Sequence, residues 1–86
     1  MTFDGALVKE QGVTFAIVVV KSYVLSSATR EETRASFAQF FPTGIPIILM
    51  AQNHKGVPTY HGREDIVEFL ANIDYRRIPW KTYTVS

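Results

Sequence analysis

Tyr60, His61 and Arg63 bring a hydroxyl, a proton-transfer group and a fixed cation together within four consecutive residues. Histidine exchanges protons near neutral pH and arginine holds anions, so this cluster could serve an acid–base or anion-binding site. The same residues fit a strand that ends at Gly62 and leaves the arginine exposed, and we favour that interpretation. A small enzyme, with Asp65 as the acid partner of this cluster, is therefore an alternative to a binding function.

The loop Ser26-Ser27-Ala28-Thr29 is a second candidate, because it follows an apolar stretch and precedes a predicted helix. The free N–H groups and dipole at a helix N-terminus attract anions, which makes Ser26, Ser27 and Thr29 candidate binding residues. The loop lacks the glycine that lets a phosphate approach the backbone closely. Thr29, with Glu32 three residues later, predicts a capping box instead, and this structural interpretation is the favoured one.

The segment from Tyr75 to Tyr83 mixes cations and aromatic rings, a composition typical of single-stranded nucleic-acid platforms. Its cations and rings are Arg76, Arg77, Lys81, Tyr75, Trp80 and Tyr83. An edge strand whose tryptophan fills the end of the core explains the segment equally well. The chain has 9 Lys and Arg against 8 Asp and Glu, a formal net charge of +1, which is too small to predict a nucleic-acid surface. Nucleic acid is therefore disfavoured as a partner.

Metal and thiol chemistry have little support in the sequence. His54 and His61 are the only histidines, and two ligands do not make a zinc site. The nearby Glu64 and Asp65 fit the first turn of a helix, where acids stabilise the dipole. The absence of cysteine excludes thiol redox activity and disulfides. We expect no metal and no cofactor, and we assign no catalytic residue.

Length and composition predict a single domain over residues 1–86. The hydrophobic fraction of 47% and the charged fraction of 20% are those of a globular protein. The uncharged run Val13–Val20 is too short to span a bilayer and lacks the flanks of a secretory signal. We therefore expect a cytoplasmic protein without a membrane partner.

Periodicity predicts strands and helices in alternation. A strand over 13–24 and another over 47–51 are apolar on both faces, which is typical of central strands. Between them, an amphipathic helix starts at Thr29 and ends before Pro42. A half-polar strand over 57–61, a second helix after Gly62 and a closing strand over 80–85 follow. In residues 2–12, Asp4-Gly5 indicates a turn, 6–8 a short strand and Gln11-Gly12 a hairpin turn.

These elements predict an α/β (α+β) two-layer sandwich of βαββαβ order, with a four-stranded mixed sheet and two helices. The strands over 13–24 and 47–51 should be parallel neighbours joined by a right-handed crossover. The closing strand should pair with the free side of the strand over 13–24. An N-terminal hairpin strand could extend the sheet. A ferredoxin-like strand order and a thioredoxin-like arrangement both remain open.

The second half of the chain resembles the thioredoxin-like fold. Gly44-Ile45-Pro46-Ile47, then Gly56 and Gly62, and Phe69-Leu70 match its proline, strand, hairpin and amphipathic helix. The resemblance is one of architecture and covers less than half the chain. The paired cysteines of that family are absent, and Ser-Ser-Ala-Thr stands in the corresponding turn. The resemblance therefore implies a fold and no redox function.

The predicted function is that of a non-enzymatic binding or assembly module that self-associates through its sheet. If both helices covered one face, as a ferredoxin-like order requires, the other apolar face would need a partner such as a second copy. The edge strand over 80–85 could also pair across a two-fold axis, and either surface could take another protein. If the helices lay on opposite faces, this pressure to form a homodimer would fall. The enzyme or anion-binding cluster and the nucleic-acid segment are the alternatives.

Overall fold

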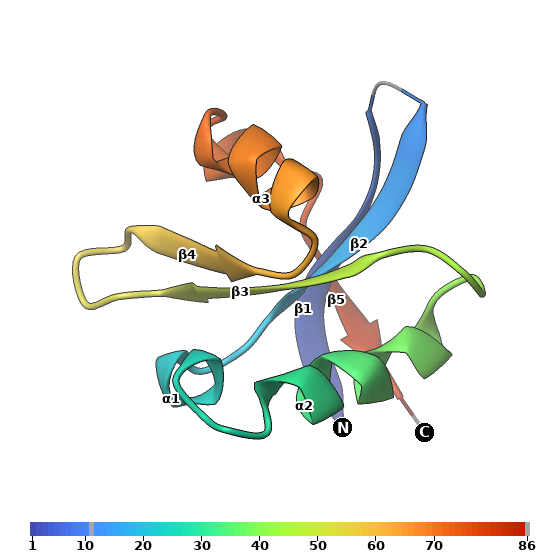
Figure 1. Cartoon of the computed structure of the whole chain (residues 1–86), viewed down its shortest axis with the longest axis horizontal. Helices are drawn as coiled ribbons and strands as arrows, with labels where there is room; N and C mark the ends of the chain where they lie inside the picture. Colours follow the sequence, from blue (N-terminus) through green and yellow to red (C-terminus); the bar gives the residue numbers. More distant parts are fainter. Residues whose placement is uncertain (11, 86) are drawn as a thin grey trace.

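The computed structural model describes residues 1–10 and 12–85 and shows a small α+β domain (Figure 1). The strands are β1 (Thr2–Glu10), β2 (Val13–Val19), β3 (Ile47–Gln52), β4 (Pro58–His61) and β5 (Lys81–Thr84). The helices are α1 (Ser22–Leu25), α2 (Arg30–Phe37) and α3 (Glu64–Ala71), with 3-10 turns η1 (Ala38–Phe40) and η2 (Tyr75–Arg77). The two main helices, α2 and α3, are those that the sequence predicts.

The strands form one mixed sheet in the order β4-β3-β2-β1-β5. As predicted, β2 and β3 are parallel neighbours, and β4 pairs antiparallel with β3. The sheet has five strands, so the prediction of four is wrong. The closing strand β5 also has a different neighbour, because β1 takes the free side of β2 and β5 pairs with β1.

The strand β1 runs through Asp4 and Gly5, where the sequence predicts a turn. Gly5 lies opposite Val18, and a Cβ atom there would be 2.7 Å from the carbonyl oxygen of Ile17. The glycine therefore allows β1 and β2 to approach closely and does not bend the chain. Gly12 has a φ of +79°, as a tight turn requires, and Gln11 of the predicted hairpin turn lies outside the described residues.

The helices cover opposite faces of the sheet, with α3 on one side and α2 on the other (Figure 1). On the α3 face, Ile66 and Leu70 pack against Phe15, Ile17 and Ile48. A second cluster on the α2 face contains Phe41 with Ala16, Val18 and Leu49, flanked by Phe37 and Phe40. The predicted two-layer arrangement is therefore wrong, because helices cover both faces, and of the two alternatives for the helices the structure has the one with opposite faces.

Candidate functional site

The backbone separates the members of the Tyr60–Arg63 cluster. Neighbouring strand residues point to opposite faces, so Tyr60 packs into the α3-side cluster while His61 reaches Glu31 of α2. Arg63 turns outward and forms a bidentate pair with Asp65, with Nε–Oδ1 at 2.7 Å and Nη2–Oδ2 at 2.8 Å. The three side chains therefore do not share one cavity with each other.

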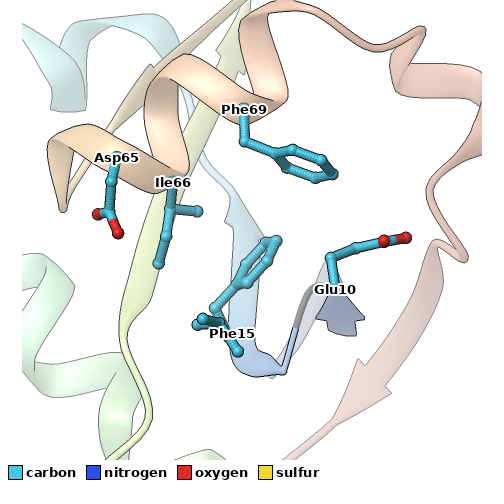
Figure 2. A pocket seen from close by; sticks show the side chains of 6 residues that line it. Glu10, Phe15, Asp65, Ile66 and Phe69 are labelled. Carbon is cyan, nitrogen blue, oxygen red and sulfur yellow. The ribbon is translucent and has the colours of Figure 1, made fainter.

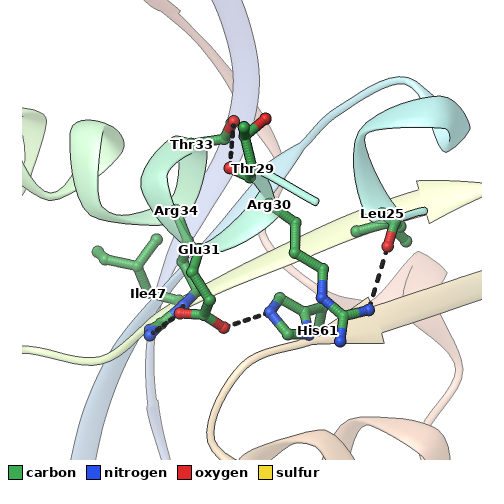
Figure 3. A network of polar contacts seen from close by, with 8 residues as sticks. All are labelled: Leu25, Thr29, Arg30, Glu31, Thr33, Arg34, Ile47 and His61. Carbon is green, nitrogen blue, oxygen red and sulfur yellow. Dashed lines mark hydrogen bonds and ion pairs between the residues drawn. The ribbon is translucent and has the colours of Figure 1, made fainter. Parts of the chain in front are cut away.

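A polar network on the α2 face joins β4 to α2 (Figure 3). The Nε2 atom of His61 lies 2.5 Å from Oε1 of Glu31, and Oε2 of the same carboxylate accepts two hydrogen bonds from Arg34. The Arg34 guanidinium and the His61 ring hold the pKa of Glu31 below its usual value. Arg34 also donates to the Ile47 carbonyl oxygen at 3.2 Å, so the network ties the helix to the sheet.

A carboxylate that orients an imidazole is a component of many acid–base sites, but no hydroxyl among the described residues is hydrogen-bonded to the His61 ring. The His61 side chain is only 20% exposed and has Glu31 as its partner, and Glu31 is also paired with the Arg34 guanidinium. The chemistry that the geometry supports is therefore a structural ion pair. Sequence reasoning missed Glu31 and Arg34, because the contact between Glu31 and His61 joins residues 30 positions apart and has no local spacing.

The Ser26–Thr29 loop closes on itself. The Thr29 side chain makes no capping hydrogen bond, so the predicted capping box with Glu32 is wrong. Its hydroxyl lies 2.9 Å from Oγ of Ser27, which also accepts from the Thr29 N–H, while Ser26 Oγ donates to the Tyr23 carbonyl oxygen. The segment before the loop, predicted as the end of a strand, is the short helix α1.

The aromatic rings of the Tyr75–Tyr83 segment are divided between the two faces. Trp80 packs on the α3 side, where its indole Nε1 donates to the Tyr75 carbonyl oxygen at 2.8 Å. Tyr83 packs on the α2 side and stacks on Phe3, with ring centroids 5.1 Å apart. Arg76 is paired with Asp74, whose pKa it lowers to about 2. The rings therefore do not form one continuous platform.

The cavities of the domain are shallow or small. One of about 100 Å³ lies between the β1–β2 hairpin and α3, lined by Phe15, Ile66 and Phe69, with the carboxylates of Glu10 and Asp65 pointing in different directions (Figure 2). That volume is below the usual range for ligand pockets. A more open hollow of about 760 Å³ lies at the carboxyl end of β2 beside α1, where open α/β sheets often bind ligands.

Polar side chains, among them those of Lys21, Ser22 and Gln52, share the lining of this hollow with apolar ones. Its walls are mainly apolar, formed by Phe3, Val19, Val24 and Phe37 among others. The Asp4 carboxylate, on its rim, already accepts a hydrogen bond from the Thr82 hydroxyl at 2.8 Å. The Thr33 hydroxyl and the Gln52 amide likewise donate within the chain, to the carbonyl oxygens of Thr29 and Gly56. The hollow therefore has the position of a ligand site, but several of its polar groups already have partners.

The outer edge of β5 has a regular set of exposed backbone groups. At its end, the Val85 N–H donates to the Met1 carbonyl oxygen at 2.8 Å, and the Met1 nitrogen donates back to Val85 at 3.2 Å. Hydrogen-bonded pairs alternate along an antiparallel ladder, so Thr84 and Thr82 direct their N–H and C=O groups away from β1. Within the described residues, no strand lies beyond β5.

The opposite edge, β4, is protected. The Asn53 N–H donates to the Val57 carbonyl oxygen at 3.0 Å, and the same alternation makes Pro58 and Tyr60 the residues that face outward. Proline has no N–H, and proline on an edge strand is a common device against unwanted pairing. The two edges therefore differ: β5 keeps every outward donor and acceptor, and β4 lacks one donor.

The Tyr60 hydroxyl is buried and has no hydrogen-bond partner among the described residues. A buried hydroxyl without a partner costs about 1 kcal/mol or more, so Tyr60→Phe should raise the free energy of unfolding by about 1 kcal/mol. Urea unfolding measured at pH 7 tests this result. A loss of stability in Tyr60→Phe would show that the hydroxyl is hydrogen-bonded.

The same substitution should reduce the loss of stability at alkaline pH. Burial raises the pKa of Tyr60, because it disfavours the phenolate. The unfolded chain therefore ionises first, and the wild type should lose stability as the pH rises past 10. Tyr83, whose pKa burial also raises, remains in both proteins, so the loss in Tyr60→Phe should be smaller and not absent. Identical alkaline profiles would contradict this prediction.

Residues 1–10 and 12–85 contain neither a cluster of metal ligands nor a membrane-spanning helix. Histidine, aspartate and glutamate side chains form no group of three able to hold a metal ion there. No helix in that part of the chain is long and apolar enough to cross a membrane. Compared with known proteins, the chain matches no family model, no curated protein and no solved structure.

Proposed function

We propose that this protein is a non-enzymatic assembly module that self-associates edge to edge through β5. One observation carries the proposal: Thr82 and Thr84 present unpaired backbone donors and acceptors at an edge that has no proline. Such an edge is a template for another strand, and a closed homodimer is the commonest way to satisfy it. Because helices cover both faces of the sheet, the edge is the part of the sheet that remains for a second copy to contact.

The placement of the candidate catalytic groups supports a non-enzymatic role. Tyr60 and His61 point to opposite faces, and Arg63 is neutralised by Asp65. The His61 ring is held by Glu31, which is itself paired with Arg34. These contacts explain the residues as structural parts of the fold.

Sedimentation equilibrium of the whole chain tests the proposal. The mass should rise with concentration from 9.7 kDa towards twice that value, within a range that extends to about 1 mM. The range is wide because a four-residue edge makes a small, transient interface. A monomer mass at every concentration would overturn the proposal.

Thr84→Pro should weaken the association at least tenfold, because proline removes an outward N–H and leaves the bonds from β5 to β1 in place. Thr84→Val is the matched control: it keeps the N–H and the β-branched shape, and should associate like the wild type. The dissociation constants of both variants are measured by sedimentation, after circular dichroism has established that each is folded. Equal association of the proline and valine variants would argue against a β5 contact.

A further inference from the structure

The geometry points to one arrangement for this pair, and the inference rests on the proposed edge-to-edge function. Two β5 strands pair antiparallel about a two-fold axis at Tyr83, so that Thr82 lies opposite Thr84 of the second copy. Every outward N–H and C=O of Thr82 and Thr84 then has a partner, because the two residues exchange both of their bonds across the axis. The sheets of the two copies become one continuous sheet.

Neighbouring registers satisfy fewer groups. A shift that places Thr82 opposite its own copy sets Thr84 opposite Trp80, whose N–H already donates to the Ile78 carbonyl oxygen at 2.8 Å. A shift in the other direction places Thr84 opposite its own copy. Thr82 then lies opposite a position beyond Val85, outside the described strand. A shift by one residue turns the side chains of the second copy to the wrong face. The register on Tyr83 is therefore the one that pairs every outward backbone group of β5.

The side chains of this register are compatible with one another. Tyr83 faces Tyr83 of the second copy in a non-hydrogen-bonded pair, where side chains are closest and aromatic pairs stabilise a sheet. On the other face of the sheet, threonine lies opposite threonine, which is also a favourable cross-strand pair.

Lys81 lies on this edge, where a lysine often prevents pairing with another strand. Its Nζ atom lies 4.6 Å from the centroid of its own Tyr83 ring, over the face of the sheet. In the proposed register it lies opposite Val85, so the two lysines of the pair are not placed against each other. The ring of Tyr83 is in turn held by Phe3 and Phe41, with ring centroids 5.1 Å and 5.3 Å away. Tyr83 therefore has its packing partners in place before the edge pairs.

The absence of cysteine from the chain allows a direct test by cross-linking. Hydrogen-bonded antiparallel neighbours have Cα atoms about 5.5 Å apart, within the range of a disulfide, whereas residues two further along exceed it. Thr82→Cys mixed with Thr84→Cys should therefore cross-link at least fivefold faster than either variant alone. One variant carries an isotope label, so that mass spectrometry separates mixed from identical pairs.

Each outcome of this experiment decides a different question. Preferred cross-linking of Thr82→Cys with itself would overturn the register and keep the β5 contact. A dimer by mass with no cross-link in any mixture would exclude β5, whereas a monomer mass would remove the proposed function as well. The unaltered chain provides a check that does not depend on the variants. In a half-labelled sample, an intermolecular Hα–Hα contact at Tyr83 is expected, and its absence from a dimer would count against the two-fold position.

Discussion

Leu49→Ala is expected to lower the free energy of unfolding by about 3 kcal/mol, because it leaves a cavity in a strand that cannot collapse around it. Leu49 lies at the centre of β3, is fully buried and belongs to the cluster under α2. For a chain of this size, the loss corresponds to a fall in Tm of about 15 °C. Urea unfolding and thermal melting of the purified variant measure the two quantities.

Leu7→Ala is the matched control for this effect. It removes the same atoms from a residue of β1 that is 45% exposed, so the expected loss is under about 1 kcal/mol. Similar losses for Leu49→Ala and Leu7→Ala would mean that the α2 face is not a packed core, which would contradict the arrangement of two covered faces.

Gly5→Ala is expected to lower the free energy of unfolding by about 2 kcal/mol, although alanine is a small residue without a polar group. The added Cβ would lie 2.7 Å from the Ile17 carbonyl oxygen and 3.3 Å from the Tyr83 ring. Because the closest atom belongs to the backbone of a central strand, the new methyl group cannot be accommodated by rotating a side chain. The strands β1 and β2 would have to separate, and denaturant unfolding should record the loss.

Lys9→Ala tests whether the Gly5 effect is specific. Lys9 is an exposed residue of the same strand, so its replacement should change the stability by less than about 0.5 kcal/mol. If Gly5 instead lay in a turn, as the Asp4-Gly5 pair suggests, the added methyl group would have no strand to displace. Gly5→Ala would then have only a small effect on the free energy of unfolding. A small effect of Gly5→Ala would therefore favour the turn.

The sequence by itself determined the elements whose signal is local. Apolar residues on both faces identify β2 and β3 as central strands, and helical spacing identifies α2 and α3. These patterns are readable because burial repeats with the period of the strand or helix itself. The lack of thiol chemistry is also determined at this level, since it depends on composition alone.

Local signals failed where a residue serves a distant neighbour. Asp and Gly are depleted in strands, so Asp4-Gly5 predicts a turn. In the structure, Gly5 is required by its approach to Ile17 in the next strand. The capping box failed for a similar reason, because the Thr29 hydroxyl has a nearer partner in Ser27.

Only the tertiary structure decided which groups meet. It separated Tyr60 from His61 and brought Glu31, with its partner Arg34, to the His61 ring, although nothing in the spacing of Glu31 and His61 indicates the contact. It also placed β1 between β2 and β5, which made β5 the edge of the sheet. A strand can pair only with backbone N–H and C=O groups that no other strand has taken. Which groups remain is a property of the whole sheet. Residue patterns along one strand do not contain this information.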